Sequence, residues 1–118
     1  MRHIQKGKNN ENIAACFLQE KGYRIIKRNW RFGKKEIDII SEKDNLLVIT
    51  EVKSRLTKSE VRPEESVSMK KQHLIIEAAE AFILQYGLDQ EVRFDVIFVD
   101  NNQADIRIEH IPDAFYPA

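Results

Sequence analysis

The chain has 118 residues, 42% of them hydrophobic and 32% charged, which is enough for one domain with a modest core and leaves no room for a second. We therefore treat residues 1–118 as one domain. No apolar segment is long enough to cross a membrane, and the first residues lack the apolar run of a secretory signal, so we expect a cytoplasmic protein with no membrane partner. The single cysteine, Cys16, excludes an internal disulfide, and its neighbours predict a packed apolar thiol.

Charge is unevenly distributed, although the chain has 19 Lys and Arg and 19 Asp and Glu. Residues 1–35 contain ten Lys or Arg and two Asp or Glu, residues 36–75 contain seven and eight, and residues 76–118 contain two and nine, so the segment charges are +8, −1 and −7. This gradient predicts one basic surface that suits the phosphates of nucleic acid. A solvated, charge-rich surface without such a partner is the alternative interpretation.

The first predicted elements are a helix and a strand. Residues 8–21 carry apolar side chains at helical spacing, and Gly22 is well placed to end the helix. Glu11 lies at the edge of the predicted buried face, where it is either a site carboxylate or simply a favourable acid in the first turn. Residues 23–30 form the first predicted strand, in which Trp30 is interpreted as a core anchor. Phosphate contacts are expected from the basic residues near its end, which are Arg28, Arg31, Lys34 and Lys35.

Two adjacent strands carry the residue types of a phosphodiester-cleaving site. Residues 36–41 and 46–53 are predicted to pair as a hairpin around a polar turn. Side chains alternate along a strand, so Glu51 and Lys53 point to one face, and Asp38 on the neighbouring strand is placed to meet Glu51. Two carboxylates suit Mg²⁺ or Mn²⁺, and a lysine beside them stabilises charge on a phosphate. A half-buried strand with a solvated face is the alternative, but these charges follow an apolar run, where desolvation is costly without a partner.

The second half of the chain predicts a loop, a helix and two strands. Residues 54–64 are polar and are predicted to form a loop over the site, with Arg55 as a phosphate contact. Residues 65–86 have a helical period, and residues 92–100 and 105–111 alternate as a second hairpin. The order α-β-β-β-α-β-β predicts an α/β fold in which a mixed central β-sheet is flanked by helices.

The segments Glu36-Ile37-Asp38 and Glu51-Val52-Lys53-Ser54-Arg55 resemble the core signature of the PD-(D/E)XK nuclease superfamily. Over essentially the whole chain, the sequence resembles the YraN family of small bacterial predicted endonucleases, which are related to Holliday-junction resolvases. The residues that carry this wider resemblance are Gly7, Glu11, Ala14, Leu18, Gly22, Arg28-Asn29-Trp30-Arg31, Val67, Lys71-Gln72, Arg93-Phe94-Asp95-Val96 and Ala114-Phe115. The resemblance implies a restriction-endonuclease-like fold and metal-dependent cleavage of DNA, in branched or otherwise structured substrates, and it leaves a homodimer open.

The same resemblance implies roles for individual residues. The residues implied to act in catalysis are Glu11, Asp38, Glu51, Lys53 and Gln72. Asp38 and Glu51, aided by the Val52 carbonyl, are expected to bind Mg²⁺ or Mn²⁺. Lys53 is expected to stabilise the transition state or to orient the attacking water.

The chain departs from the family pattern at two positions. The family usually has glycine immediately before each of two acids, whereas this chain has Asn10 before Glu11 and Lys35 before Glu36. Glycine permits a positive φ or a close backbone approach, and Lys35 adds a cation where a phosphate would pass. These departures favour the alternative function, a catalytically inactive nucleic-acid-binding module of the same fold. A structural or protein-interaction domain with a fortuitous charge pattern is a third interpretation.

Overall fold

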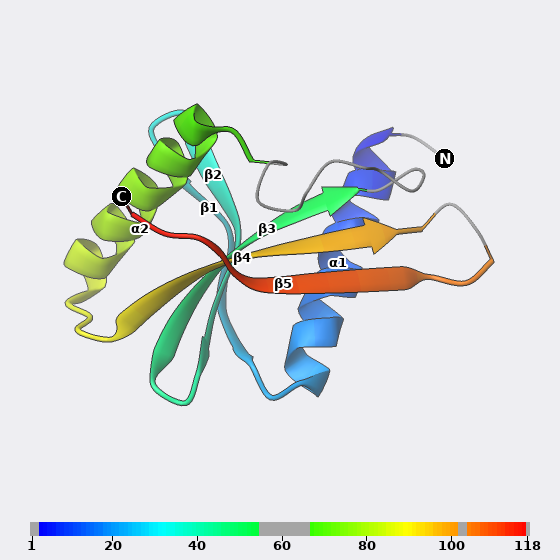
Figure 1. Cartoon of the computed structure of the whole chain (residues 1–118), viewed down its shortest axis with the longest axis horizontal. Helices are drawn as coiled ribbons and strands as arrows, with labels where there is room; N and C mark the ends of the chain where they lie inside the picture. The colour runs from blue at the N-terminus through cyan, green and yellow to red at the C-terminus, as the bar shows by residue number, and fades with distance from the viewer. Residues whose placement is uncertain (1–2, 55–66, 102–103, 118) are drawn as a thin grey trace.

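The protein was analysed as a computed structural model, which describes residues 3–54, 67–101 and 104–117. Its elements are α1 (His3–Glu20), β1 (Arg24–Phe32), β2 (Lys35–Lys43), β3 (Leu46–Ser54), α2 (Met69–Tyr86), β4 (Glu91–Asp100) and β5 (Arg107–Phe115) (Figure 1). The strands form one five-stranded sheet in the order β1-β2-β3-β4-β5, in which β3 and β4 are parallel and the other neighbours are antiparallel. The predicted α/β fold with a mixed sheet and two helices is therefore confirmed.

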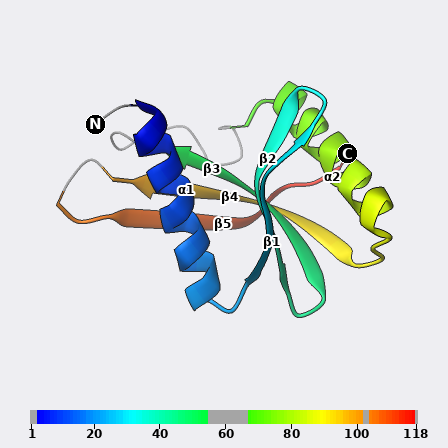
Figure 2. The same cartoon turned by 180° about the vertical axis from the view of Figure 1, so that it is seen from behind.

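The two helices cover opposite faces of the sheet (Figures 1 and 2). Ala14 and Leu18 of α1 pack in one buried cluster with Ile39, Ile97 and Val99 of the sheet. The larger cluster lies under α2, and its members include Ile75, Phe82, Ile37, Ile40, Leu47, Ile49, Phe94 and Val96. Burying each of the large apolar side chains contributes about 1.5–3 kcal/mol, so these two layers hold the helices on the sheet. Within the described part of the chain, neither helix is long and apolar enough to cross a membrane.

Local capping sets the helix ends. Gly22, with a φ of 93°, follows α1, and Gly87, with a φ of 61°, follows α2, both in the left-handed conformation that glycine adopts at low cost. The second helix begins at Met69 and not at residue 65 as predicted, because the Ser68 hydroxyl accepts the Lys71 N–H at 3.2 Å and caps the first turn.

The predicted packing of Cys16 is wrong, because its side chain is exposed. The buried arc of α1 consists of Asn10, Ala14, Ala15 and Leu18. At about 100° per residue, Cys16 lies well away from the middle of that arc and faces outward. Apolar neighbours in the sequence therefore did not define the buried face of this helix.

A bend in the β1–β2 hairpin turns its free end from one face of the sheet to the other. Ile39 packs in the cluster under α1, whereas Ile37 packs in the cluster under α2. In a regular strand, side chains two residues apart share a face. The pairs Arg28–Ile39 and Trp30–Ile37 flank Asn29, whose φ of 53° is left-handed. The tip of the hairpin therefore lies close to the start of α2 (Figure 1).

Trp30 is a core anchor, as predicted. Its ring meets the Phe82 ring of α2 edge-on, with centroids 5.2 Å apart. Phe32, which is 46% exposed, lies parallel to the Trp30 ring with centroids 6.4 Å apart. The aromatic side chains of β1 thus run from the core to the surface near the hairpin tip.

Candidate active site

The candidate site forms where β2 parts from β3. The antiparallel pairing of these strands reaches the pair Ile39–Thr50, and Asp38 is the next residue of β2. The Oδ2 atom of Asp38 accepts the Val52 N–H at 2.8 Å, so the carboxylate bridges the strands beyond their paired region. Burial raises the pKa of Asp38 above its usual value, and the hydrogen bond from Val52 opposes this effect.

Glu51 lies on β3 at the same end of the sheet and is only 5% exposed. Alternation along β3 places it on the face of Leu47 and Ile49, which α2 covers. Its Oε2 atom accepts a hydrogen bond from Nζ of Lys35 at 3.0 Å, whereas its buried Oε1 atom meets no donor among the described residues. Burial, and then the nearby charge of Asp38, raise the pKa of Glu51 to about 7. The negative charge of Asp38 therefore acts on the Glu51 carboxylate.

Lys53 follows Glu51 on the same face of β3. Burial, and then the charge of Lys71, lower the pKa of Lys53, while Glu51 opposes the shift. Lys71 lies in the first turn of α2, and its side chain is within hydrogen-bonding reach of Lys53. Two ammonium groups at this distance repel each other, and an anion such as a phosphate oxygen beside them lowers the electrostatic energy.

Glu11 and Gln72 make other contacts. The Glu11 carboxylate lies 3.8 Å from the guanidinium of Arg28. The buried Gln72 amide donates to the Val67 carbonyl at 2.9 Å and so fixes the chain as it enters α2. No three His, Cys, Asp or Glu side chains in the described residues form a group that could hold a metal, so no third acidic ligand joins the two strand carboxylates there.

The predicted phosphate contacts separate into different environments. Arg31 is 65% exposed and lies 3.4 Å from Glu36 across the hairpin, and Lys34 is exposed in the hairpin turn. Arg28 donates to the Asn12 side chain at 2.7 Å and is thereby tied to α1. Arg55 lies outside the described residues.

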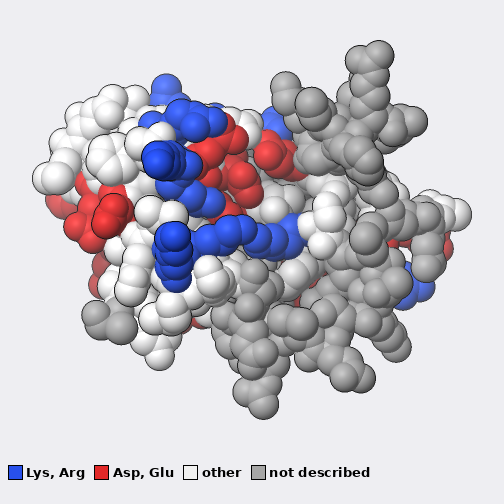
Figure 3. Space-filling view, turned by 90° about the horizontal axis from the view of Figure 1, so that it is seen from above, with Lys and Arg blue, Asp and Glu red and all other residues white. Residues whose placement is uncertain are grey.

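The end of the molecule that carries the hairpin tip is charged. Viewed from above, Lys and Arg side chains gather beside Asp and Glu side chains on this surface (Figure 3). Lys35 belongs to this end but is largely buried, since its side chain is 16% exposed. Among the predicted basic contacts, Arg31 and Lys34 are the described residues best placed to meet a phosphate backbone in solvent.

Asn10 and Lys35, the two residues that depart from the family pattern, make contacts at the edges of the site. The described residues other than glycine with positive φ do not include Asn10 or Lys35, so neither position requires the left-handed conformation of glycine. Asn10 is 2% exposed and donates its side-chain N–H to the Ser54 hydroxyl at 2.7 Å, which joins α1 to the end of β3. Lys35 donates to the Oε2 atom of Glu51.

The donor set fits a hard divalent cation. Asp38 and Glu51 lie on neighbouring strands directly beyond the Ile39–Thr50 pair, and the buried Oε1 atom of Glu51 lacks a partner among the residues that the structure describes. Mg²⁺ commonly binds through one or two carboxylates and completes its coordination with water and substrate phosphate, so a third acidic side chain is not required. Asp38 and Glu51 are thus the residues that would hold the ion.

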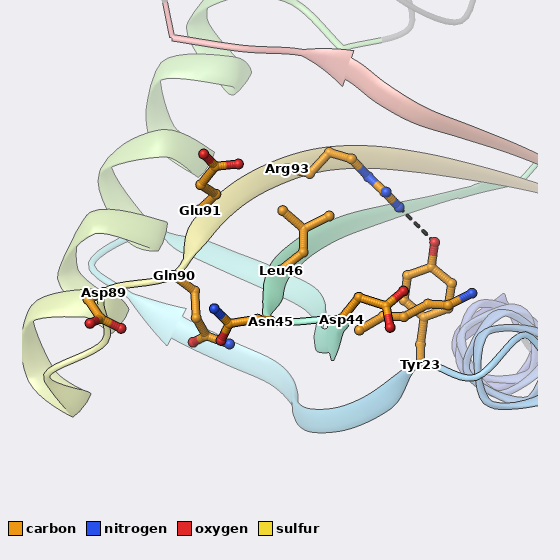
Figure 4. A pocket seen from close by; sticks show the side chains of 9 residues that line it. Tyr23, Asp44, Asn45, Leu46, Asp89, Gln90, Glu91 and Arg93 are labelled. Atoms are coloured by element: carbon orange, nitrogen blue, oxygen red, sulfur yellow. Dashed lines mark hydrogen bonds between the residues drawn. The ribbon is translucent and has the colours of Figure 1, made fainter.

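A second polar cluster was not foreseen from the sequence. Asp95 is fully buried, and its carboxylate accepts two hydrogen bonds from Arg93, both at 2.8 Å, and one from the Asp113 N–H at 3.0 Å. Nε2 of His110 lies 2.7 Å from the same carboxylate, and Arg93 also donates to the Tyr23 hydroxyl at 2.7 Å (Figure 4). Burial favours a raised pKa for Asp95, but these hydrogen bonds outweigh it and lower the pKa below its usual value. The alternation of Arg93 and Asp95 on β4 was the available sequence signal.

A surface pocket of about 640 Å³ lies beside this second cluster (Figure 4). Tyr23 and Arg93 line it together with residues at the start of β3 and of β4, including Leu46 and Glu91. Because β3 and β4 are parallel, this is the end of the sheet opposite Glu51. The pocket is therefore separate from the two strand carboxylates.

The fold and the site together define an α/β protein with two buried carboxylates and a lysine at the end of a parallel strand pair. Residues 10–99 match the family described as Uncharacterised protein family UPF0102. The chain is 43% identical over 114 residues to the UPF0102 protein FP2501 of Flavobacterium psychrophilum, covering 97% of this chain and 96% of the relative. It is 44% identical over 115 residues to a UPF0102 protein of Bacteroides thetaiotaomicron, covering 98% and 95%. The chain belongs to the UPF0102 family, which is the YraN family indicated by its sequence.

One solved structure is distantly similar. It is the structure of Pyrococcus furiosus SfsA in complex with Ca2+, which shares 17% identity with this chain at a TM-score of 0.35. The match covers 92% of this chain and 62% of that one.

Proposed function

We propose that the protein is a metal-dependent endonuclease of the PD-(D/E)XK type that hydrolyses DNA phosphodiesters in the cytoplasm, in branched or otherwise structured DNA. The observation that carries the proposal is the position of Asp38 and Glu51 on neighbouring strands where β2 parts from β3, with Lys53 on the face of Glu51. Buried carboxylates are costly unless a cation compensates them. Their position at the end of a strand, with an unpartnered oxygen among the described residues, supports a working site over a solvated strand face.

The chain's own residues would have separate roles in phosphodiester hydrolysis. The Val52 amide holds the carboxylate of Asp38 in place, and its carbonyl is the backbone ligand that the resemblance implies. Mg²⁺ or Mn²⁺ bound by Asp38 and Glu51 would polarise the scissile phosphate and lower the pKa of a bound water. Lys53, with Lys71 beside it, offers positive charge to the phosphate as negative charge develops. A water-orienting role for Glu11 and a supporting role for Gln72 stay predictions.

The test is incubation with labelled four-way junction, flap, single-stranded and linear duplex DNA, with Mg²⁺, with Mn²⁺ and with chelator. Cleavage should require the divalent ion, and each of Asp38→Asn, Glu51→Gln and Lys53→Ala should abolish it. Glu42→Gln is the matched control, because Glu42 lies on the same strand as Asp38 but pairs with Arg24 at its other end. Cleavage that persists in chelator, or full activity of the three variants, contradicts the proposal.

The second candidate is a nucleic-acid-binding module without turnover. The observation that favours it is the buried ion pair of Lys35 with Glu51, which places an ammonium where a metal ion would bind. This candidate predicts that the protein binds junction or flap DNA in chelator as well as in Mg²⁺ and cleaves none of the substrates.

A further inference from the structure

The contact between Lys35 and Glu51 is a largely buried ion pair and not a solvent-exposed one. Nζ of Lys35 lies 3.0 Å from Oε2 of Glu51, and the two side chains are 16% and 6% exposed. A lysine ordinarily keeps its ammonium in water and buries only its aliphatic stem. Taking both charges out of water is costly, and the pairing is what offsets that cost.

The Lys35 ammonium and a divalent ion would compete for the Glu51 carboxylate. With Glu51 ionised, the ammonium groups of Lys35 and Lys53 offset the negative charges of Asp38 and Glu51. Lys71 adds a further positive charge beside Lys53. A divalent ion added to this arrangement would leave at least two uncompensated positive charges in a buried place. Like charges a few ångströms apart repel strongly there, because water screens them poorly. The site therefore reaches its highest affinity for the divalent ion only if one ammonium group moves away from the carboxylates.

Lys35 is the ammonium that is free to leave. It is the first residue of β2 and pairs with Phe32 directly beside the hairpin turn, where Gly33 has a φ of 60° and Lys34 is exposed. Its flexible four-carbon stem can swing toward solvent without moving the strand. Lys53, in contrast, lies inside β3 and is followed by Ser54, which is bound by Asn10.

We infer that Lys35 is a tethered cation that occupies the Glu51 carboxylate in the metal-free protein and is exchanged for the divalent ion. Once displaced, its ammonium joins Arg31 and Lys34 at the hairpin tip, where it meets a DNA phosphate. The inference rests on the proposed function, since it concerns the same metal site. It makes Lys35 the residue that sets how tightly the site holds its metal.

The test is calorimetric titration of Mn²⁺ into the wild-type protein, Lys35→Met, Lys35→Arg and Lys27→Met at one pH and one ionic strength. Lys35→Met keeps the stem and removes the charge, so it should bind Mn²⁺ at least about tenfold more tightly than wild type. Lys35→Arg restores a cation and should bind like wild type. Lys27→Met is the charge-matched control, because Lys27 is exposed on the same hairpin and lies over the Tyr86 ring, and it should not change the affinity.

A second measurement follows the Lys35 ammonium in the wild-type protein. The ¹⁵N signal of the Lys35 ammonium, assigned by its loss in Lys35→Met, should shift or broaden on saturation with diamagnetic Mg²⁺ as the ion pair opens. Equal Mn²⁺ affinity in wild type and Lys35→Met, or an unchanged signal at saturating Mg²⁺, overturns the inference and leaves the nuclease proposal standing. Tighter binding by Lys35→Met without cleavage of any DNA supports the inference and defeats the nuclease proposal. Absence of Mn²⁺ binding in every variant defeats both.

Discussion

The Oδ2 atom of Asp38 accepts the backbone N–H of Val52 at 2.8 Å, across the point where β2 parts from β3. A backbone N–H that loses its ladder partner inside a protein must find another acceptor. The carboxylate of Asp38 thus serves the fold by accepting this N–H and serves the candidate site by its negative charge. Variants at this position separate the two roles.

Asp38→Asn should remain folded and lose activity, because an amide oxygen still accepts the Val52 N–H but carries no charge for a metal ion. Asp38→Ala removes the acceptor as well and leaves that N–H unpaired, which costs about 1–3 kcal/mol of the free energy of unfolding. Urea unfolding of both variants and of wild type in chelator measures the difference. Equal stability of the alanine and asparagine variants would show that the hydrogen bond is dispensable.

The metal-free protein should lose stability as pH rises through neutrality. The pKa of Glu51 is raised from 4.5 to about 7, so the folded state holds a proton that the unfolded state releases. This contribution is complete below about pH 4.5 and disappears as pH rises past about 7, and by linkage it amounts to about 3 kcal/mol at most. Urea midpoints between pH 5 and pH 8 in chelator should therefore fall in wild type and fall less in Glu51→Gln.

Glu42→Gln is the control for that series. Hydrogen bonds from Arg24 and Gln90 lower the pKa of Glu42, so its titration has the opposite direction and lies below the measured range. This variant should keep the wild-type decline between pH 5 and pH 8. A decline of the same size in Glu51→Gln would assign the effect to another group.

Asp95 should make the protein sensitive to acid. Its pKa is lowered in the folded state, so its contribution is present above the unfolded pKa of about 3.9 and is lost as pH falls below it. Asp95→Asn should cost about 3–5 kcal/mol at pH 7, because it leaves the Arg93 guanidinium partly buried without its counter-charge. Thermal unfolding of this variant checks the cost, and Asp105→Asn, at an exposed position, should change stability by less than about 0.5 kcal/mol.

DNA affinity should depend on the hairpin tip. Reversing charge at Arg31 and Lys34 should weaken binding to all DNA structures together, because phosphate contacts carry little sequence information. The slope of log affinity against log salt should flatten by about one unit for each phosphate that the variant no longer binds. Charge reversal at Lys21 and Arg24, two exposed cations that lie before β1 and at its first residue, should leave the slope unchanged. Binding measured by fluorescence anisotropy at several salt concentrations distinguishes the two pairs. Equal effects of both double variants would mean that net charge, and not the hairpin tip, drives binding.

The sequence by itself determined the features that depend on local periodicity. Period-two alternation placed Glu51 and Lys53 on one face of β3, and glycines marked the ends of both helices. The apolar run before Glu51 indicated a covered strand, and Glu51 is indeed buried. These properties follow from backbone geometry that each segment carries within itself, so they are visible without knowledge of the partner elements.

Only the tertiary structure decided the contacts that close the site. The left-handed φ of Asn29 bends the hairpin, so that Ile37 and Ile39 face different helices although strict alternation puts them together. Beyond this bend, Lys35 donates to Glu51, although the sequence indicated separate roles for these two residues. Register ends, bends and buried ion pairs depend on which strand lies alongside and how much water it excludes, and these quantities are set by residues far away in the sequence.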